Sequence, residues 1–402
     1  MKNELELLKE IEYVRFGGTR QEYKTALWII DRLAELGLKA HHEAFNVGAS
    51  IVSSHSLVAD GEEIASRVLF GSPSVKDLKA PLYYFSHNDE VSLSEVKDKI
   101  VLVDRLGYWN YKDLFEHKAL AVIVYNGDLY DDNRDIDQRE IRAMEKEVGL
   151  MPVVQIHVKD AYRLIQDGVK EVCINIDSKD VEAESGNVIC DIEGDSDKTL
   201  VFTAHYDSVW LSKGAYDNAT GTIGLIQIAE YFAEHKPHHN IRFIFCGSEE
   251  RGLLGSKDYV ERHKDELKDI ALCINLDMIG STMGHFDACV SAEADLVSYL
   301  RYLACEEGVS LNLYHDVYSS DSTPFADSGV PAMSFACNTS VTPIHNRHDT
   351  SASLSLEHFK EDIAFIITFA EKMANSKVFP VKREIPDSIK EKLDIYMCRK
   401  RK

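Results

Sequence analysis

Residues 198–221 read KTLVFTAHYDSVWLSKGAYDNATG, and the interpretation of the whole chain starts from this stretch. A short apolar run of strand-like composition, 200–204, stops abruptly at His205 and Asp207. Twelve residues after His205, Asp217 opens an amphipathic helical pattern. Buried charges are costly unless they are paired or bound to metal, and ligands of open α/β sheets sit at the carboxyl ends of strands. The stretch therefore predicts a functional site at the end of a buried strand.

The composition is that of a soluble globular protein with an acidic surface. The 402 residues include 45 Lys and Arg against 67 Asp and Glu, a formal net charge of −22. Such a balance disfavours nucleic acid and anionic membranes as partners, because both need clustered basic residues. We see no apolar run of membrane-span length and no secretory leader in MKNELELLKEIEYV. The eight cysteines are widely spaced and form no metal-binding knuckle, so we expect reduced, buried thiols and a cytoplasmic location.

Strand-like and helical patterns alternate after about residue 187. This alternation predicts an α/β fold: a three-layer αβα sandwich around a mixed, mostly parallel sheet. The strands are expected at 187–192, 199–204, 241–246, 270–276, 311–314 and 331–336. The helices are expected at 219–235, 254–264, 292–307 and 355–375.

The preceding part of the chain has a different character. Residues 20–37 have the apolar spacing of a strong amphipathic helix. Residues 49–186 hold short strand-like runs and a highly charged segment, 126–147, which we interpret as solvated. We therefore expect a discontinuous domain of residues 1–48 and 187–402, interrupted by a β-rich inserted domain of residues 49–186.

Five potential metal ligands follow apolar runs or lie in the loops after them, at intervals of 12, 33, 27 and 68 residues. Mixed imidazole and carboxylate ligands suit Zn²⁺, with Mn²⁺ or Co²⁺ as possible substitutes. Two ions are accommodated if one carboxylate bridges them. The five residues are His205, Asp217, Glu250, Asp277 and His345.

Three further acids have a role beside these ligands. Asp207 is placed to accept the second ring N–H of His205, and Asp349 to do the same for His345. Glu249 is the acid left over from ligation, and we expect it to face the water that the metals bind.

The motifs together resemble the M28 family of zinc-dependent aminopeptidases. They are AHYDSV, GAYDNATG, CGSEERGLLGS, INLDMIG and IHNRHDT, and the likeness extends over residues 187–370, with RFGGTRQEY similar to the family's N-terminal entry. The resemblance implies two zinc ions, one held by His205 and Asp277 and the other by Glu250 and His345. It also implies that Asp217 bridges the ions, that Glu249 is the general base, and that the Asp217–Asn218 peptide is cis.

One motif departs from the family pattern. The family usually has His, a small residue, Pro, an acid or Ala, and then Asp, whereas this chain has His345-Asn346-Arg347-His348-Asp349. We prefer His345 over His348 as the ligand, because Asp349 then keeps its usual offset. The inserted segment also resembles a protease-associated domain, through KIVLVDRLGYW, ALAVIVYNGD and MPVVQIHVKDAYRLI. Such a domain would sit beside the active-site mouth and restrict which peptides enter.

The predicted function is hydrolysis of the N-terminal peptide bond of peptides with a free N-terminus. Tyr318 could add a hydrogen bond to the oxyanion. A glutaminyl cyclase on the same scaffold would use one zinc, which the intact pair of His205 and Asp207 argues against. A carboxypeptidase would need arginines for the substrate carboxylate, and Arg251 and Arg347 lie near the motifs. A non-catalytic binding module, as in transferrin-receptor-like proteins, would be expected to lack ligands or the base. Neither the oligomeric state nor the preferred residue follows from the sequence.

Overall fold

The computed structural model describes residues 4–341 and 344–401. The chain forms two compact units, one built from residues up to Asn46 together with Glu184–Lys400, and the other from Val47–Ala183. The sequence-based boundaries lie two residues later at the first crossing (49 against 47) and three later at the second (186 against 183).

The first unit is built on a mixed sheet in the order β13-β12-β14-β11-β9-β10-β8. The four central strands β14, β11, β9 and β10 run parallel to one another, while β12 and β8 pair antiparallel with β14 and β10. The sheet is therefore mostly parallel in its centre, as predicted. The strands are β8 (Glu171–Ile192), β9 (Thr199–His205), β10 (Asn240–Cys246), β11 (Ile270–Leu276), β12 (His285–Ser291), β13 (Asn312–Tyr314) and β14 (Ala332–Asn338).

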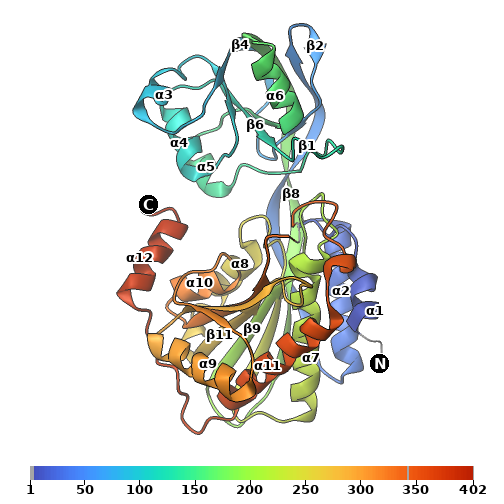
Figure 1. Cartoon of the computed structure of the whole chain (residues 1–402), viewed down its shortest axis with the longest axis vertical. Coiled ribbons are helices and arrows are strands. Elements are labelled where there is room, and N and C mark those ends of the chain that lie inside the picture. Colours follow the sequence, from blue (N-terminus) through green and yellow to red (C-terminus); the bar gives the residue numbers. More distant parts are fainter. Residues whose placement is uncertain (1–3, 342–343, 402) are drawn as a thin grey trace. The chain divides into compact units, whose positions relative to one another are not determined.

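Helices cover both faces of this sheet, which confirms the three-layer αβα architecture (Figure 1). Five helices share one core with the sheet: α1 (Glu4–Ile11), α2 (Arg20–Glu35), α7 (Thr220–Glu234), α9 (Ala294–Glu307) and α11 (Leu356–Ala374). Three pack into a second core on the opposite face: α8 (Leu254–Arg262), α10 (Ser322–Asp327) and α12 (Asp387–Tyr396). Short helical turns lie at Ala215–Ala219, Leu267–Asp269 and Ser351–Ser353.

Two local features bring helices close to the strand ends. Thr19 caps α2, because its side chain accepts a hydrogen bond from the Glu22 N–H. Gly221 in the first turn of α7 lies so close to β11 that a Cβ there would come within 2.4 Å of the Leu276 carbonyl oxygen. Only glycine permits this approach, and it sets the start of α7 against the strand end that precedes Asp277.

The second unit has a sheet in the order β8-β4-β5-β6-β7-β3, with β4 to β7 parallel. Helix α6 packs on one face of this sheet and α4 on the other. The strands are β1 (Ala40–Ala59), β2 (Glu62–Glu63), β3 (Ser66–Val68), β4 (Val75–Tyr84), β5 (Ile100–Val103), β6 (Ala121–Asn126) and β7 (Val153–His157). The helices are α3 (Glu90–Ser94), α4 (Tyr108–Glu116), α5 (Ala143–Val148) and α6 (Val158–Gln166).

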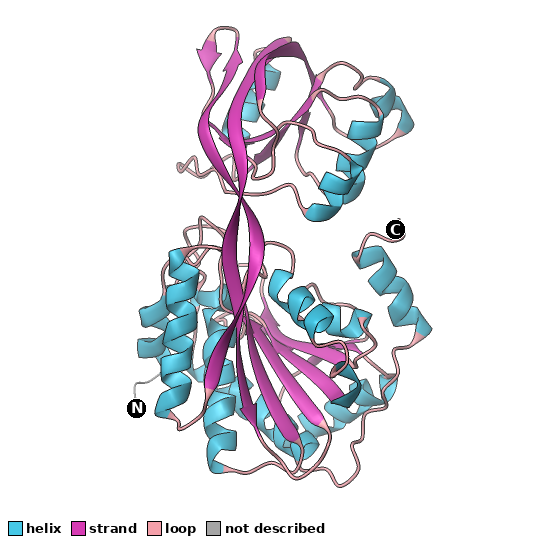
Figure 2. Ribbon diagram, turned by 180° about the vertical axis from the view of Figure 1, so that it is seen from behind, coloured by secondary structure: helices cyan, strands magenta, loops and turns pink. Residues whose placement is uncertain are grey.

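The structure differs from the sequence-based elements in two places. The expected strand 187–192 is the end of one long strand, β8, which begins at Glu171 and pairs with the equally continuous β1 (Figure 2). The intervening residues are charged and resemble a loop, but pairing with β1 keeps them extended. Strand β12 was not predicted at all. No helix within the described residues combines the length and apolar character needed to cross a membrane.

Candidate metal centre

Three of the five predicted ligands lie at or just after the carboxyl ends of three adjacent parallel strands. His205 is the last residue of β9, Glu250 lies in the loop after β10, and Asp277 directly follows β11. Because β11, β9 and β10 are neighbours in the sheet, their ends converge at one edge. Asp217 comes from the turn before α7, and its peptide bond to Asn218 is cis, as the family resemblance led us to expect.

The five predicted ligands come together in two groups that share Asp217. His205 Nε2 lies 3.1 Å from Asp217 Oδ1 and 3.6 Å from Asp277 Oδ1. His345 Nε2 lies 3.1 Å from Asp217 Oδ2 and 3.0 Å from Glu250 Oε2. Each oxygen of Asp217 therefore faces a different histidine, which is the geometry that a bridging carboxylate requires.

The chemistry of this cluster suits two bound cations. Four carboxylates (Asp217, Glu249, Glu250 and Asp277) meet only two imidazoles. Within the described part of the chain, the buried oxygens Oδ1 of Asp277 and Oε1 of Glu250 accept no hydrogen bond. Uncompensated buried carboxylates cost several kcal/mol, and nitrogen and oxygen donors in such a set fit Zn²⁺.

Burial and neighbouring charges shift the pKa values of this cluster in opposite directions. Burial raises the pKa of Asp277, and it raises the pKa of Glu250 to about 7 with a contribution from the Asp217 carboxylate. Burial opposes ionisation of Asp217 too, but hydrogen bonds from His205 and His345 hold its pKa below the ordinary value. For His345, burial would lower the pKa, yet Glu250 and Asp217 raise it to about 11. The cluster thus holds more carboxylates than its two histidines can balance in charge.

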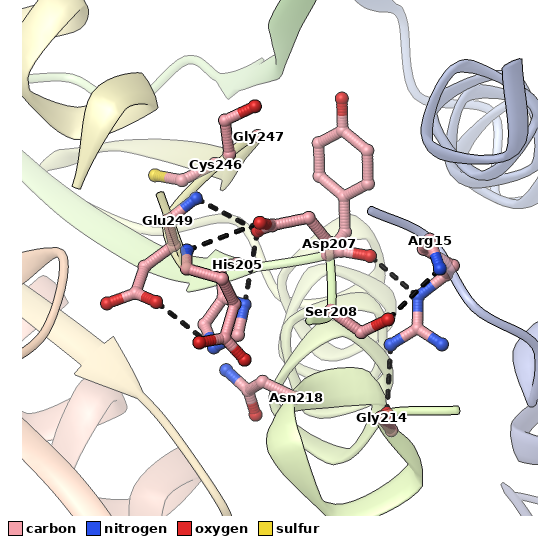
Figure 3. A network of polar contacts seen from close by, with 12 residues as sticks. Arg15, His205, Asp207, Ser208, Gly214, Asn218, Cys246, Gly247 and Glu249 are labelled. Atoms are coloured by element: carbon pink, nitrogen blue, oxygen red, sulfur yellow. Dashed lines mark hydrogen bonds and ion pairs between the residues drawn. The ribbon is translucent and has the colours of Figure 1, made fainter. Parts of the chain in front are cut away.

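Asp207 connects the His205 ring to the loop after β10. Its Oδ1 lies 3.3 Å from His205 Nδ1, the position predicted for an orienting acid. The same carboxylate accepts hydrogen bonds from the backbone N–H groups of Glu249, at 3.0 Å, and Glu250, at 3.2 Å (Figure 3). Asp207 is completely buried. It therefore lies beside a predicted ligand and holds the loop that carries the predicted base.

Glu249 points toward the same centre without entering either ligand group (Figure 3). Its Oε2 lies 3.9 Å from His205 Nε2, farther than Asp217 or Asp277. Burial raises the pKa of the Glu249 carboxyl well above its ordinary value, although the charge of His205 opposes this shift. A raised pKa is typical of carboxyl groups that exchange protons during catalysis.

The expectation for Asp349 is wrong. Its carboxylate does not orient His345 but accepts hydrogen bonds from the backbone N–H groups of Tyr216, at 2.7 Å, and Asp217, at 3.2 Å. It also accepts the Ser212 hydroxyl at 3.2 Å. Asp349 thus holds the backbone that presents the shared carboxylate. Tyr318, considered for the oxyanion, donates its hydroxyl to Asn338 Oδ1 at 3.2 Å.

Arg15 is a supporting residue that the sequence analysis missed. Its guanidinium is completely buried and donates to backbone carbonyl oxygens rather than to a carboxylate. One of these belongs to Tyr206, at 2.7 Å. A second belongs to Gly214, at 2.8 Å (Figure 3). The other three belong to Ile11, Tyr13 and Lys213. Arg15 therefore connects the segment after His205 with the segment before Asp217.

Glu22 supports the loop after β10 in a similar way. Its Oε1 accepts the Ser248 N–H at 2.8 Å and the Ser185 hydroxyl at 2.8 Å. Burial, together with the Asp207 carboxylate, raises the pKa of Glu22 to about 8. A sequence signal for this residue existed: Glu22 stands four positions before Ala26, on the core-facing side of α2. An acid on an apolar helix face indicates a buried polar partner.

Known proteins resemble this chain in both sequence and fold. A family model described as Peptidase family M28 matches residues 187–370. Aminopeptidase YwaD of Bacillus subtilis (strain 168) is 30% identical over 336 residues, which cover 80% of this chain and 71% of that protein. Leucine aminopeptidase 2 of Trichophyton equinum is 29% identical over 280 residues, 66% of this chain and 54% of that protein. The chain thus spans only about half the length of the fungal relative.

Solved structures resemble the chain over nearly its full length. The structure of BSAP, described as a zinc aminopeptidase from Bacillus subtilis, has a TM-score of 0.78 at 25% identity and covers 96% of this chain and 97% of its own. The aminopeptidase from Aneurinibacillus sp. strain AM-1 has a TM-score of 0.75 at 22% identity, with 94% and 95% covered, and supports the fold alone.

Proposed function

This chain belongs to peptidase family M28 and is a zinc-dependent aminopeptidase, and from this premise we propose that it removes N-terminal residues from peptides with two zinc ions and Glu249 as the general base. The observation that carries the proposal is the position of Asp217 between two pairs, His205 with Asp277 and His345 with Glu250. A carboxylate with one oxygen toward each pair suits a bridge between two ions. Zn²⁺ is the proposed metal, and Mn²⁺ or Co²⁺ would fit the same donors.

Zinc at this centre would lower the pKa of a water and polarise the scissile carbonyl. The chain's own groups supply the proton transfers. Glu249 Oε2 takes the proton from the attacking water and later delivers it to the leaving amine, so the same carboxyl acts as base and then as acid. Its side chain is 12% exposed, so it can meet a bound water, and its raised pKa suits both roles.

The remaining groups position these partners. Asp207 accepts hydrogen bonds from the backbone N–H groups of Glu249 and Glu250, and in this way it orients the proposed base, Glu249. The Tyr318 hydroxyl is available to donate to the tetrahedral oxyanion, in place of its bond to Asn338. The excess of carboxylates favours a substrate with a positively charged α-amine near the reacting bond, which selects the first residue of a peptide.

The test is a metal-dependent assay with leucyl-p-nitroanilide and its N-acetylated form. We expect the metal-free protein to be inactive, two equivalents of Zn²⁺ to restore activity, and the acetylated substrate to resist hydrolysis. A carboxypeptidase would cleave an N-blocked dipeptide, a cyclase would convert a glutaminyl peptide without releasing a residue, and a binding module would do neither. Full activity in the metal-free protein would remove this mechanism.

The unit of Val47–Ala183 fits the protease-associated domain that its sequence resembles. The three stretches that carry the resemblance contain β5, β6 and β7, which are adjacent parallel strands. We assign it the role of limiting substrate length. A chain in which residues 50–185 are replaced by a short linker, with zinc retained, should then accept long peptides relatively better than wild type does. An unchanged ratio between dipeptide and long-peptide hydrolysis would argue against this role.

A further inference from the structure

A hollow of about 370 Å³ opens on the outer strands of the first unit's sheet. Its floor is formed by alternate residues of β12 and β14, and the segment before α10 forms a wall that includes Val317 and Tyr318. Asp287 and Cys289 of β12, with Ala336 of β14, line the floor. Of the residues that line the hollow, the proposed reaction uses Tyr318 and its partner Asn338, and it gives no role to Asp287 or Cys289.

The hollow lies beside the metal centre on the same face of the sheet. Leu276 pairs with Phe335, and the next residue of β14, Ala336, pairs with Asp287. The Asp277 N–H donates to the Phe335 carbonyl oxygen at 3.0 Å, so β11 and β14 are still paired at the metal centre. Neighbouring strands are about 4.8 Å apart. The backbones at Asp277 and Asp287 are therefore about 10 Å apart, two strand spacings.

Asp287 is a buried acid for which the described part of the chain supplies no ion-pair partner. Its side chain is 5% exposed, and its oxygens accept the amide N–H groups of Asn312, at 2.8 Å, and Asn338, at 2.7 Å. No lysine, arginine or histidine of the described chain forms an ion pair with it. Two amides satisfy part of the carboxylate's hydrogen-bonding capacity but leave its charge uncompensated.

A second acid at the same hollow, Asp316, already has a cation as its partner. Asp316 at the rim is exposed, and its Oδ2 forms an ion pair with Lys392 Nζ at 3.0 Å. Its charge is already balanced within the chain. Asp287 is therefore the acid on the floor of the hollow that still lacks a positive partner.

We propose that this hollow receives the side chain of the substrate's first residue and that Asp287 pairs with its cation, so that the enzyme prefers N-terminal Lys or Arg. The inference rests on the proposed function, because it places the α-carbon of that residue at the metal centre. An extended lysine side chain spans about 6 Å from Cα to Nζ, five bonds of about 1.5 Å. The lysine side chain and the side chain of Asp287 together span the distance of about 10 Å between the backbones at Asp277 and Asp287. Cys289, Val317 and Ala336 offer apolar contact to the methylene stem.

Two measurements separate this inference from the proposed function. Turnover of lysyl-, arginyl-, leucyl- and alanyl-p-nitroanilide by the zinc-loaded enzyme tests both, and we expect kcat/KM for Lys and Arg to exceed that for Leu at least tenfold. Calorimetric binding of L-lysinamide and L-norleucinamide to the zinc-loaded Glu249→Gln protein, which should bind these amides without hydrolysing them, tests the hollow alone, because the two ligands differ mainly in the terminal cation. We expect lysinamide to bind at least tenfold more tightly.

The variant Asp287→Asn removes the charge while keeping an acceptor for one amide. It should lower the Lys-to-Leu ratio of kcat/KM at least tenfold and abolish the difference between the two amides. Asp327→Asn is the matched control: it removes the same charge from α10, where Asp327 pairs with Arg399 at 2.5 Å, and it should leave both ratios unchanged. If wild type prefers leucine, or if D287N keeps the wild-type ratios, the inference is overturned. Absence of all anilide hydrolysis would instead refute the proposed function, and the amide binding would still decide the role of Asp287.

Discussion

Replacement of Arg15 by lysine should destabilise the first unit and weaken zinc binding, although the charge is retained. The guanidinium forms hydrogen bonds to five backbone carbonyl oxygens at distances of 2.5–3.0 Å. A lysine ammonium has at most three donors. At least two of these carbonyl oxygens, in a region closed to solvent, would therefore lose their partner.

The size of the effect follows from those two lost bonds. A buried polar group left without a hydrogen bond costs about 1–3 kcal/mol, so we expect the free energy of unfolding to fall by about 2–6 kcal/mol. For a domain of this size, 1 kcal/mol shifts Tm by about 2–4 °C. Even at the lower bound, Arg15→Lys should lower Tm by about 4–8 °C.

Differential scanning calorimetry of the zinc-free and zinc-loaded proteins measures this shift. The destabilisation should be accompanied by weaker zinc binding in a chelator competition, because Arg15 fixes the backbone of Tyr206 and Gly214 on either side of the ligand-bearing segments. Arg262→Lys is the matched control, since Arg262 forms only a surface ion pair with Asp258. A Tm within 1 °C of wild type, together with unchanged zinc affinity, would refute the reasoning.

Three further predictions concern single carboxylates. Glu249→Gln should lower kcat at least about 100-fold with the zinc content unchanged by elemental analysis, because it removes the proposed base; activity near that of wild type would mean that another group takes the proton. Asp207→Asn should lower kcat by about 10–100-fold with little change in KM, since one acceptor for the backbone at Glu249 is lost, and an equal loss in KM would indicate a different role. Burial raises the pKa of Asp362, which accepts the Gly280 N–H, to about 7. Since this folded-state pKa lies above the unfolded value of 3.8, Asp362 should destabilise the fold progressively as pH rises from about 4 to about 7, with no further loss above that pH. Asp362→Asn should remove this loss in Tm measurements across that range; equal pH profiles for variant and wild type would contradict the assignment.

Much of the candidate site could be predicted because each ligand follows a strand that is locally recognisable. The runs before His205 and Asp277 are short and apolar, and the loop with Glu250 follows another such run. The cis peptide at Asp217–Asn218 was also foreseen, on the family resemblance. These features depend on residues close in the chain, and strand periodicity is visible over such short distances.

Other features depend on partners far apart in sequence, and only the tertiary structure decided them. Asp349 was matched to the nearby His345, yet it binds the backbone of Tyr216, 133 residues away. Arg15 and Glu22 find their partners across similar gaps. Strand β12, which carries Asp287, was not predicted. Its pairing with β14 places Asp287 opposite Ala336, and only the structure shows this pairing.

The sequence by itself thus determined most strands and helices of the first unit, the type of fold and the acids and imidazoles available at the strand ends. The tertiary structure decided which of these groups face one another and which buried charge is left without a counterion. The physical reason is that apolar periodicity is a local property of the chain, whereas hydrogen-bond partners and compensating charges are selected by packing between distant segments.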